Sequence, residues 1–154
     1  MTYTPSSIMA DENFIEQDII DILKKSFSEN AALIKPFPED PQYEDGVLDY
    51  VMTHPKCEIL VDCDNIDFGQ GTLAEQDGDV GIEITVFARN VRGEDGARNI
   101  CSLVRQSLTG NIVAGSRIIS NDQRKIYYDK NNVWCYGQHY TLNTIFPFGY
   151  EEEV

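Results

Sequence analysis

The chain has 154 residues, and its 26 acidic and 12 basic side chains give a formal net charge of −14. This length suits one domain with its own hydrophobic core, so we expect a single domain over residues 1–154. The acidic excess argues against a nucleic-acid-binding surface, because binding phosphates requires clustered Lys and Arg. No apolar run approaches the roughly 20 residues that cross a bilayer, and no signal peptide is recognisable at the N-terminus.

The first third of the chain predicts one helix and one short strand. Residues 1–10 are rich in Ser, Thr and Pro and are expected to form a flexible arm. Asp11 is a good N-cap for an amphipathic helix over residues 11–29. A strand over residues 33–37 must lie at a sheet edge, because proline cannot donate to a central ladder. Residues 38–55 are acidic and are predicted to be irregular, which makes this long loop an interface candidate.

Strands and a second helix are predicted in the middle of the chain. Residues 57–62 resemble a buried strand, and residues 80–88 alternate between apolar and polar side chains as a half-buried strand does. The Gly- and Asp-rich residues 64–79 between them are expected to form a loop. Apolar residues recur at helical spacing over residues 94–109, and Gly110 is suited to end that helix.

The last third predicts a long β-hairpin with arms at residues 117–129 and 133–146. Residues 147–154 are expected to form an acidic tail. Two amphipathic helices each need an apolar surface to cover, and the strands supply it. The predicted fold class is therefore α+β, with a largely antiparallel sheet, two helices packed on one face and a long C-terminal hairpin.

The residues that most often carry chemistry form no recognisable constellation. No CxxC pair occurs, so buried, reduced thiols are the favoured interpretation of Cys57, Cys63, Cys101 and Cys135. The two histidines are isolated, no phosphate-binding loop or dinucleotide motif is present, and we expect neither an enzyme nor a cofactor. Asp62, Asp64 and Asp67 are weak candidates for binding Ca²⁺ or Mg²⁺, and turn formation explains them better because the EF-hand pattern is not matched.

Aromatic side chains are concentrated in the C-terminal hairpin. Aromatic residues on one face of a strand usually belong to the core. A long hairpin can also pair with the sheet of a neighbouring subunit, in which case its aromatics lie at an interface. Both interpretations stay open for Tyr127, Tyr128, Trp134, Tyr136 and Tyr140.

Several segments, taken in order, carry a resemblance to a known family. They are His54-Pro55 with the strand at 57–61, residues 81–90 ending in Ala88-Arg89-Asn90, Gly96-Ala97, residues 103–110, residues 132–136, Tyr140 and Thr144. No single segment is specific, but their order and spacing over residues 14–146 are similar to the tail terminator family of Mu-like and related contractile-tailed bacteriophages. The acidic segment 62–79 departs from the family pattern.

The resemblance implies a structural virion protein that is assembled in the host bacterial cytoplasm. Such a subunit forms a homohexameric ring on the head-proximal end of the tail tube, stops polymerisation of tube and sheath, and joins the tail to neck and connector proteins. DNA passes through the lumen without specific binding, and the acidic charge of the chain suits this role. No membrane partner is implied.

Two other functions remain as alternatives. One is another neck protein, such as a head–tail connector or a tail completion subunit, because these also assemble as rings from small α+β chains. The other is a small metal-dependent hydrolase that uses the acidic cluster from Asp62 to Asp67. A bound metal would raise the thermal stability of the protein by mass action, which separates the second alternative from the structural roles.

Overall fold

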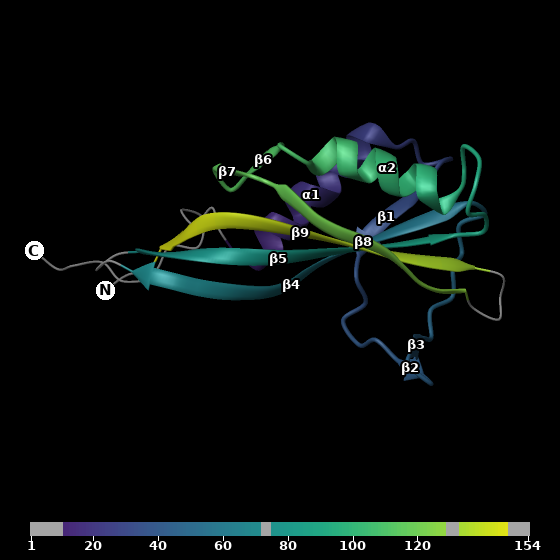
Figure 1. Ribbon diagram of the computed structural model, residues 1–154, viewed down its shortest axis with the longest axis horizontal. Helices are drawn as coiled ribbons and strands as arrows, with labels where there is room; N and C mark the ends of the chain where they lie inside the picture. The colour runs from purple at the N-terminus through teal and green to yellow at the C-terminus, as the bar shows by residue number, and fades with distance from the viewer. Residues whose placement is uncertain (1–10, 72–74, 129–132, 148–154) are drawn as a thin grey trace, which may run out of the picture.

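The computed structural model describes residues 11–71, 75–128 and 133–147. Two helices, α1 (Glu12–Ser26) and α2 (Ala97–Leu108), lie on one side of a five-stranded sheet (Figure 1). The strands are β1 (Leu33–Pro36), β2 (Tyr43–Glu44), β3 (Val47–Leu48), β4 (Cys57–Gly71), β5 (Glu75–Ala88), β6 (Ile112–Val113), β7 (Ser116–Arg117), β8 (Ile119–Tyr128) and β9 (Trp134–Pro147).

The sheet has the order β1-β4-β5-β9-β8, and all its neighbours run antiparallel except β1 and β4, which are parallel. The short strand pairs β2–β3 and β6–β7 are separate small hairpins. The predicted α+β class, the two helices on one face and the C-terminal hairpin are confirmed. The expected edge position of the proline-containing strand is also confirmed, because β1 forms one margin of the sheet.

Each helix begins and ends for a local reason. The Asp11 side chain accepts a hydrogen bond from the Phe14 N–H at 2.7 Å, which caps α1 as predicted. α1 ends at Ser26, before the expected boundary, because Phe27 is extended and turns its ring into the core. α2 runs from Ala97 to Leu108, so it begins three residues after the expected start at Glu94. The backbone is already extended at Thr109, and the expected glycine, Gly110, follows with a positive φ of 81°.

The main core lies between the two helices and the sheet face that they cover. Alternating side chains of the strands point into it, and each fully buried Ile or Leu contributes about 1.5–3 kcal/mol to folding. The main core includes Ile15, Ile19, Leu23, Cys57, Ile59, Val61, Ile82, Ile84, Val86, Ile100, Cys101, Val104, Tyr140 and Leu142. The predicted inward faces of the central strands are therefore correct.

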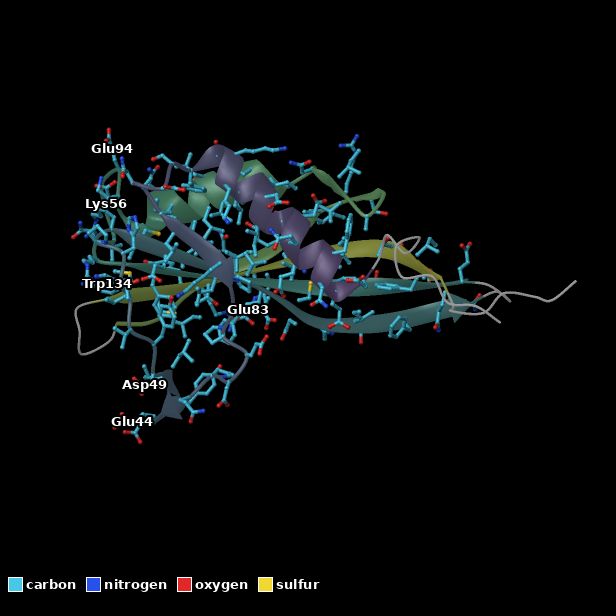
Figure 2. All side chains as sticks on the ribbon, turned by 180° about the vertical axis from the view of Figure 1, so that it is seen from behind. Glu44, Asp49, Lys56, Glu83, Glu94 and Trp134 are labelled. Carbon is cyan, nitrogen blue, oxygen red and sulfur yellow. The ribbon has the colours of Figure 1, made fainter. Side chains whose placement is uncertain are left out.

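A second, smaller core lies on the opposite face of the sheet. The segment before β4 lies on this face, away from the helices, and carries the β2–β3 hairpin with Glu44 and Asp49 (Figure 2). Its Tyr50 ring stacks on Phe87 with the ring centroids 4.8 Å apart. The second core contains Leu48, Met52, Leu60, Phe87, Val133 and Cys135. The expected irregular loop is thus partly a hairpin and is packed against the sheet over part of its length.

The expected loop over residues 64–79 is wrong. β4 continues to Gly71 and β5 begins at Glu75, so most of the segment is strand. Its Gly and Asp residues have low strand propensity, but β9 pairs with β5 along its whole length and overrides that preference. Phe68 also packs edge-on against Phe146, with the ring centroids 5.4 Å apart.

Some sequence predictions concern the ends of the chain. The proposed arm at residues 1–10 lies outside the described residues. The predicted tail begins at residue 147, which is still part of β9, and its remainder lies outside the described residues as well. Among the described residues, no helix is both long enough and apolar enough to cross a membrane.

Candidate functional site

Two margins of the sheet lack a neighbouring strand in the part of the chain that the structure describes. β8 has no outer partner, and β4 loses its outer partner where β1 ends opposite Val61. The next donor on β4, the Cys63 N–H, bonds to the Glu16 carboxylate of α1 at 3.3 Å. Unpaired strand edges can accept a strand from another chain. β8 limits such pairing with two register shifts and mostly polar, exposed side chains.

Toward one end of the molecule, the β4–β5 hairpin carries acidic side chains and no Lys or Arg. No basic residue occurs between Lys56 and Arg89 in the sequence. The part of the β4–β5 hairpin within this stretch, residues 62–71 and 75–83, is called the acidic arm below. Its carboxylates belong to Asp62, Asp64, Asp67, Glu75, Asp77, Asp79 and Glu83.

Two carboxylates of the acidic arm have raised pKa values. Burial raises the pKa of Asp62, and the nearby Asp64 carboxylate raises this pKa further. Burial also raises the pKa of Glu83, whereas His139 lowers it in part. Both shifts favour the protonated forms of Asp62 and Glu83, because burial and neighbouring carboxylates oppose their negative charge.

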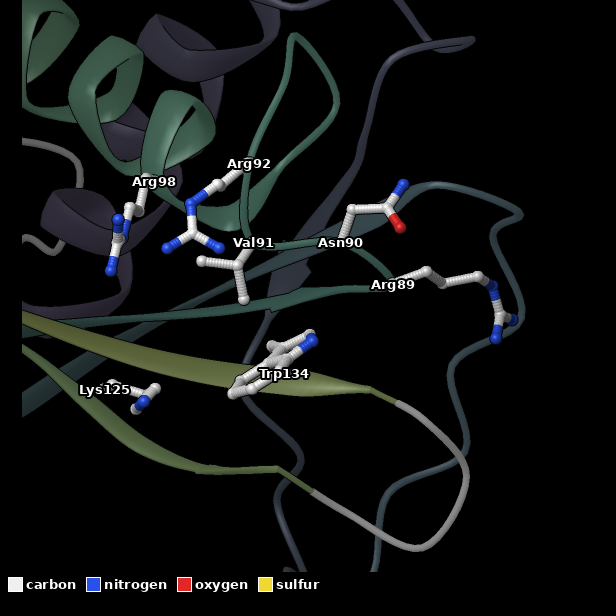
Figure 3. Close-up of a pocket in the computed structure, with 7 residues that line it drawn as sticks. All are labelled: Arg89, Asn90, Val91, Arg92, Arg98, Lys125 and Trp134. Carbon is white, nitrogen blue, oxygen red and sulfur yellow. The ribbon is translucent and has the colours of Figure 1, made fainter.

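The opposite end of the molecule carries a basic pocket. Arg89, Arg92, Arg98 and Lys125, four of the chain's 12 basic residues, line a pocket of about 420 Å³ together with Trp134. Figure 3 shows Arg92, Arg98 and Lys125 gathered on one side of the Trp134 ring, whereas Arg89 points away. The Lys125 Nζ lies 5.2 Å from the centroid of that ring, a cation–π contact.

The cations of the basic pocket have few internal partners. Arg89 donates through Nε to the Pro55 carbonyl at 3.1 Å. Within the described residues, none of the four cations has a carboxylate oxygen within 4.0 Å. Nearby Asp95 instead lies 3.8 Å from Lys56. Among the described residues, the pocket therefore gathers cations that have no carboxylate partner.

A buried carboxylate anchors the segment that covers the second core. The Glu58 side chain has no exposed surface and accepts hydrogen bonds from the Tyr50 hydroxyl at 2.5 Å and from the backbone N–H groups of Thr53 and His54 at 2.6 and 3.1 Å. The Lys35 ammonium lies 3.5 Å away. Burial, together with the bond to Glu58, raises the pKa of Tyr50. This network is a structural anchor, since its donors are used within the chain.

Both histidines make contacts that hold parts of the fold together. The His54 Nδ1 accepts from the Lys56 and Cys57 N–H groups at 3.0 and 3.2 Å, and its Nε2 lies 2.8 Å from the Glu29 carbonyl oxygen. The His139 Nδ1 lies 2.7 Å from an Asp122 carboxylate oxygen, and this hydrogen bond lowers the pKa of Asp122. These contacts explain both imidazoles without a catalytic role.

The metal candidates lie along one strand. A register shift after Cys63 separates Asp62, which pairs opposite Glu83, from Asp67, which pairs opposite Asp79. Asp64 is exposed at that shift. No group of three or more possible metal-binding side chains occurs among the described residues. The arrangement therefore offers no built site for the hydrolase alternative in this part of the chain.

The aromatic interface candidates fall into different environments. Tyr136 and Tyr140 are 5% and 1% exposed and belong to the main core, so the core interpretation holds for them. Trp134 is half-buried and lines the basic pocket. Tyr127 and Tyr128 lie on β8, where their backbones pair with Cys135 and Trp134. Trp134 is thus the candidate that lies beside the cations of the basic pocket, whereas Tyr140 borders two smaller pockets.

The cysteines agree with the expectation of buried, unpaired thiols. All four are buried and none forms a disulfide. Burial raises the pKa of Cys63 and of Cys101 to about 12, and it raises the pKa of Cys57 as well. Thiols that stay protonated are poor nucleophiles and poor metal ligands, which fits a packing role.

Sequence reasoning did not find the basic pocket or the Glu58 anchor. The pocket residues come from the turn after β5, from α2 and from the C-terminal hairpin, so only the fold brings them together. The anchor had a local signal, because Glu58 is the one charged residue within the apolar run that opens β4. A carboxylate in such a run requires several donors nearby.

Comparison with known proteins places the chain in a family. The family model described as Gp37 protein matches residues 19–149. A chain from the virion of a native gene transfer agent particle has a similar fold, with a TM-score of 0.57 and 9% sequence identity over 84% of this chain and 92% of that one. No curated protein matches the sequence. Because the family model spans most of its length, the chain belongs to the Gp37 protein family.

Proposed function

We propose that this chain is a structural virion protein and serves as a tail terminator, forming a hexameric ring on the head-proximal end of a phage tail tube. The observation that carries the proposal is the fold, which is shared with a chain of a gene transfer agent virion over 84% of this chain. The ordered resemblance of residues 14–146 to tail terminators supports the more specific role. The proposed location is the tail–neck region of the virion.

A ring of this kind works through geometry. A subunit that binds its neighbour through two different surfaces forms head-to-tail contacts, and these close into a ring when the rotation between subunits is right. This chain offers different surfaces at its two ends, one acidic and one basic. The two faces of the resulting ring differ, so one docks on tube and sheath and the other faces the neck and connector proteins.

The proposed role requires neither a reaction nor a cofactor. DNA that moves through the lumen must not adhere to it, and a net charge of −14 repels the phosphate backbone. A ring that combines six such subunits repels it more strongly. Passage without specific binding is therefore the proposed relation to the genome.

The proposed function is tested by adding the full-length chain to tail-tube protein that is polymerising. We expect shorter tubes, each with a ring of six-fold symmetry at one end in electron micrographs. A head–tail connector or completion protein would leave tube length unchanged and would bind neck components instead. A chain that stays monomeric, does not bind the tubes and does not change their length would contradict the terminator proposal.

A further inference from the structure

We propose that the basic pocket of one copy receives the acidic arm of the next copy, so that charge pairs join neighbours in the ring. The inference rests on the proposed function, because it names the two surfaces through which the ring closes. Its elements are the cations around Trp134 and the exposed carboxylates of the β4–β5 hairpin.

The basic pocket is chemically suited to carboxylates. Arg92 lies on the turn after β5 and Arg98 in the first turn of α2, and both side chains are exposed. A guanidinium group holds a carboxylate through two parallel N–H bonds, and such pairs are strongest beside an apolar surface that excludes water. Trp134 forms that surface here. Since these cations lack carboxylate partners in the described part of the chain, binding an anion breaks no existing ion pair.

The acidic arm offers the complementary groups. Asp64 and Asp67 are exposed, and Asp67 lies directly opposite the exposed Asp79 in the strand register. Like charges placed directly opposite each other destabilise a sheet, so a cation that approaches from outside relieves repulsion as well as adding attraction. The arm contributes no basic side chain of its own, so nothing within it offsets its charge.

The positions of the two surfaces require a second copy. The tip of the β4–β5 hairpin and the turn between β5 and α2, which contributes to the pocket, lie toward opposite ends of the long axis (Figure 1). A chain therefore cannot bring its own arm to its own pocket. Contacts between unlike surfaces are head-to-tail and propagate from copy to copy until they close. This is the type of contact that a homohexameric ring needs.

Nucleic acid fits the basic pocket less well than a second copy does. Binding to DNA gains affinity from many phosphate contacts along an extended basic surface. This pocket gathers only four cations on a chain with a net charge of −14, and one of the four, Arg89, points away. An acidic protein segment of limited size matches it better.

The test uses reversed charges in the full-length chain. The pocket variant is Arg92→Glu with Arg98→Glu, and the arm variant is Asp64→Lys with Asp67→Lys. Each alone places like charges across the contact, and we expect self-association about ten- to a hundred-fold weaker than wild type in sedimentation velocity. The pair Lys24→Glu and Arg124→Glu, which lies outside the pocket and changes the charge equally, is the control and should associate like wild type.

Mixing the two variants gives the sharpest outcome. In the mixture, the acidic pocket of the pocket variant meets the basic arm of the arm variant. The unchanged basic pocket of the arm variant meets the unchanged acidic arm of the pocket variant. The mixture should therefore form rings of wild-type mass in which the two variants alternate, although each variant alone is dissociated. Circular dichroism of each variant shows that the monomers are folded, and recovery in the mixture shows it independently.

The possible outcomes separate this inference from the proposed function. Rings that form equally well with the pocket variant, or a mixture that stays dissociated, overturn the inference and leave the terminator proposal standing. If wild-type chain forms no ring either alone or on tail tubes, both fall. Duplex DNA that binds wild type and not the pocket variant identifies the pocket as a phosphate site and also overturns the inference.

Discussion

Glu58 connects the segment over the second core to β4 through three hydrogen bonds and a nearby ammonium group. A buried carboxylate is stable only when its lone pairs are used, because an unpaired buried charge costs several kcal/mol. The same contacts position Tyr50 against Phe87. Loss of the carboxylate therefore weakens both the hydrogen bonding and the packing of this face.

We predict that Glu58→Gln destabilises the fold by about 1–3 kcal/mol, because the amide presents one acceptor oxygen where the carboxylate presents two. Urea unfolding measures this change. Asp49→Asn makes the same chemical substitution at an exposed position of the same segment and should change stability by less than about 0.5 kcal/mol. Equal stability of the Glu58→Gln variant and the wild type would show that the anchor contributes nothing.

A second prediction at the level of single residues concerns alkaline pH. Burial raises the pKa of Cys101 to about 12, so the folded thiol stays protonated while the unfolded thiol ionises near pH 8.5. Between about pH 9 and 12 the folded state binds more protons, and stability falls by up to about 1.4 kcal/mol per pH unit for each such thiol. Cys101→Ala should make the fall of stability with pH less steep by the contribution of one titrating thiol.

The measurement for Cys101 is the unfolding free energy at a series of pH values from 8 to 11. Val104→Ala removes buried volume from the same helix without removing a thiol, so it should lower stability at every pH and leave the slope unchanged. If the unfolding free energy of Cys101→Ala depends on pH as that of the wild type does, the thiol ionises at the same pH in the folded and the unfolded state.

Elements with a clear apolar period were predictable from the sequence. The stripe of α2 and the alternation of residues 80–88 identified both elements and the faces that they bury. The acidic arm could not be predicted in this way, because Gly69, Gly71 and Gly78 and its Asp residues have the composition of a loop. Its β5 strand pairs with β9, from Glu83 with His139 to Glu75 with Pro147, and no local pattern reveals so distant a partner.

The acidic arm should therefore unfold locally when its packing is disturbed. A methyl group added at Gly78 would approach the Phe146 ring to 2.8 Å and Ile66 to 3.1 Å. We predict that Gly78→Ala increases amide hydrogen exchange in residues 65–70 and 76–80 about ten-fold, with little change in residues 82–88. In Gly137→Ala the new methyl meets only the mobile tip of Ile126, and the arm should stay protected. Uniform loss of protection would mean that the arm is no separate unit.

The distribution of charge over the whole molecule has a consequence for its environment. The net charge of the chain was predictable from composition, but its division between two ends depends on how the fold places Arg92, Arg98 and Lys125. Net repulsion among carboxylates opposes the compact monomer, whereas attraction between unlike ends favours assembly. Salt screens both effects, so added salt should stabilise the folded monomer and weaken association between copies.

We predict that raising NaCl from about 0.1 to 1 M, which shortens the Debye length from about 10 to 3 Å, weakens ring formation and raises the melting temperature of the monomer. Sedimentation velocity measures the first and differential scanning calorimetry the second. The pocket variant Arg92→Glu with Arg98→Glu should lose the salt dependence of association, because its attractive contact is already absent. Association that strengthens with salt would indicate an apolar contact, such as pairing through the open edge of β8, in place of charge pairs.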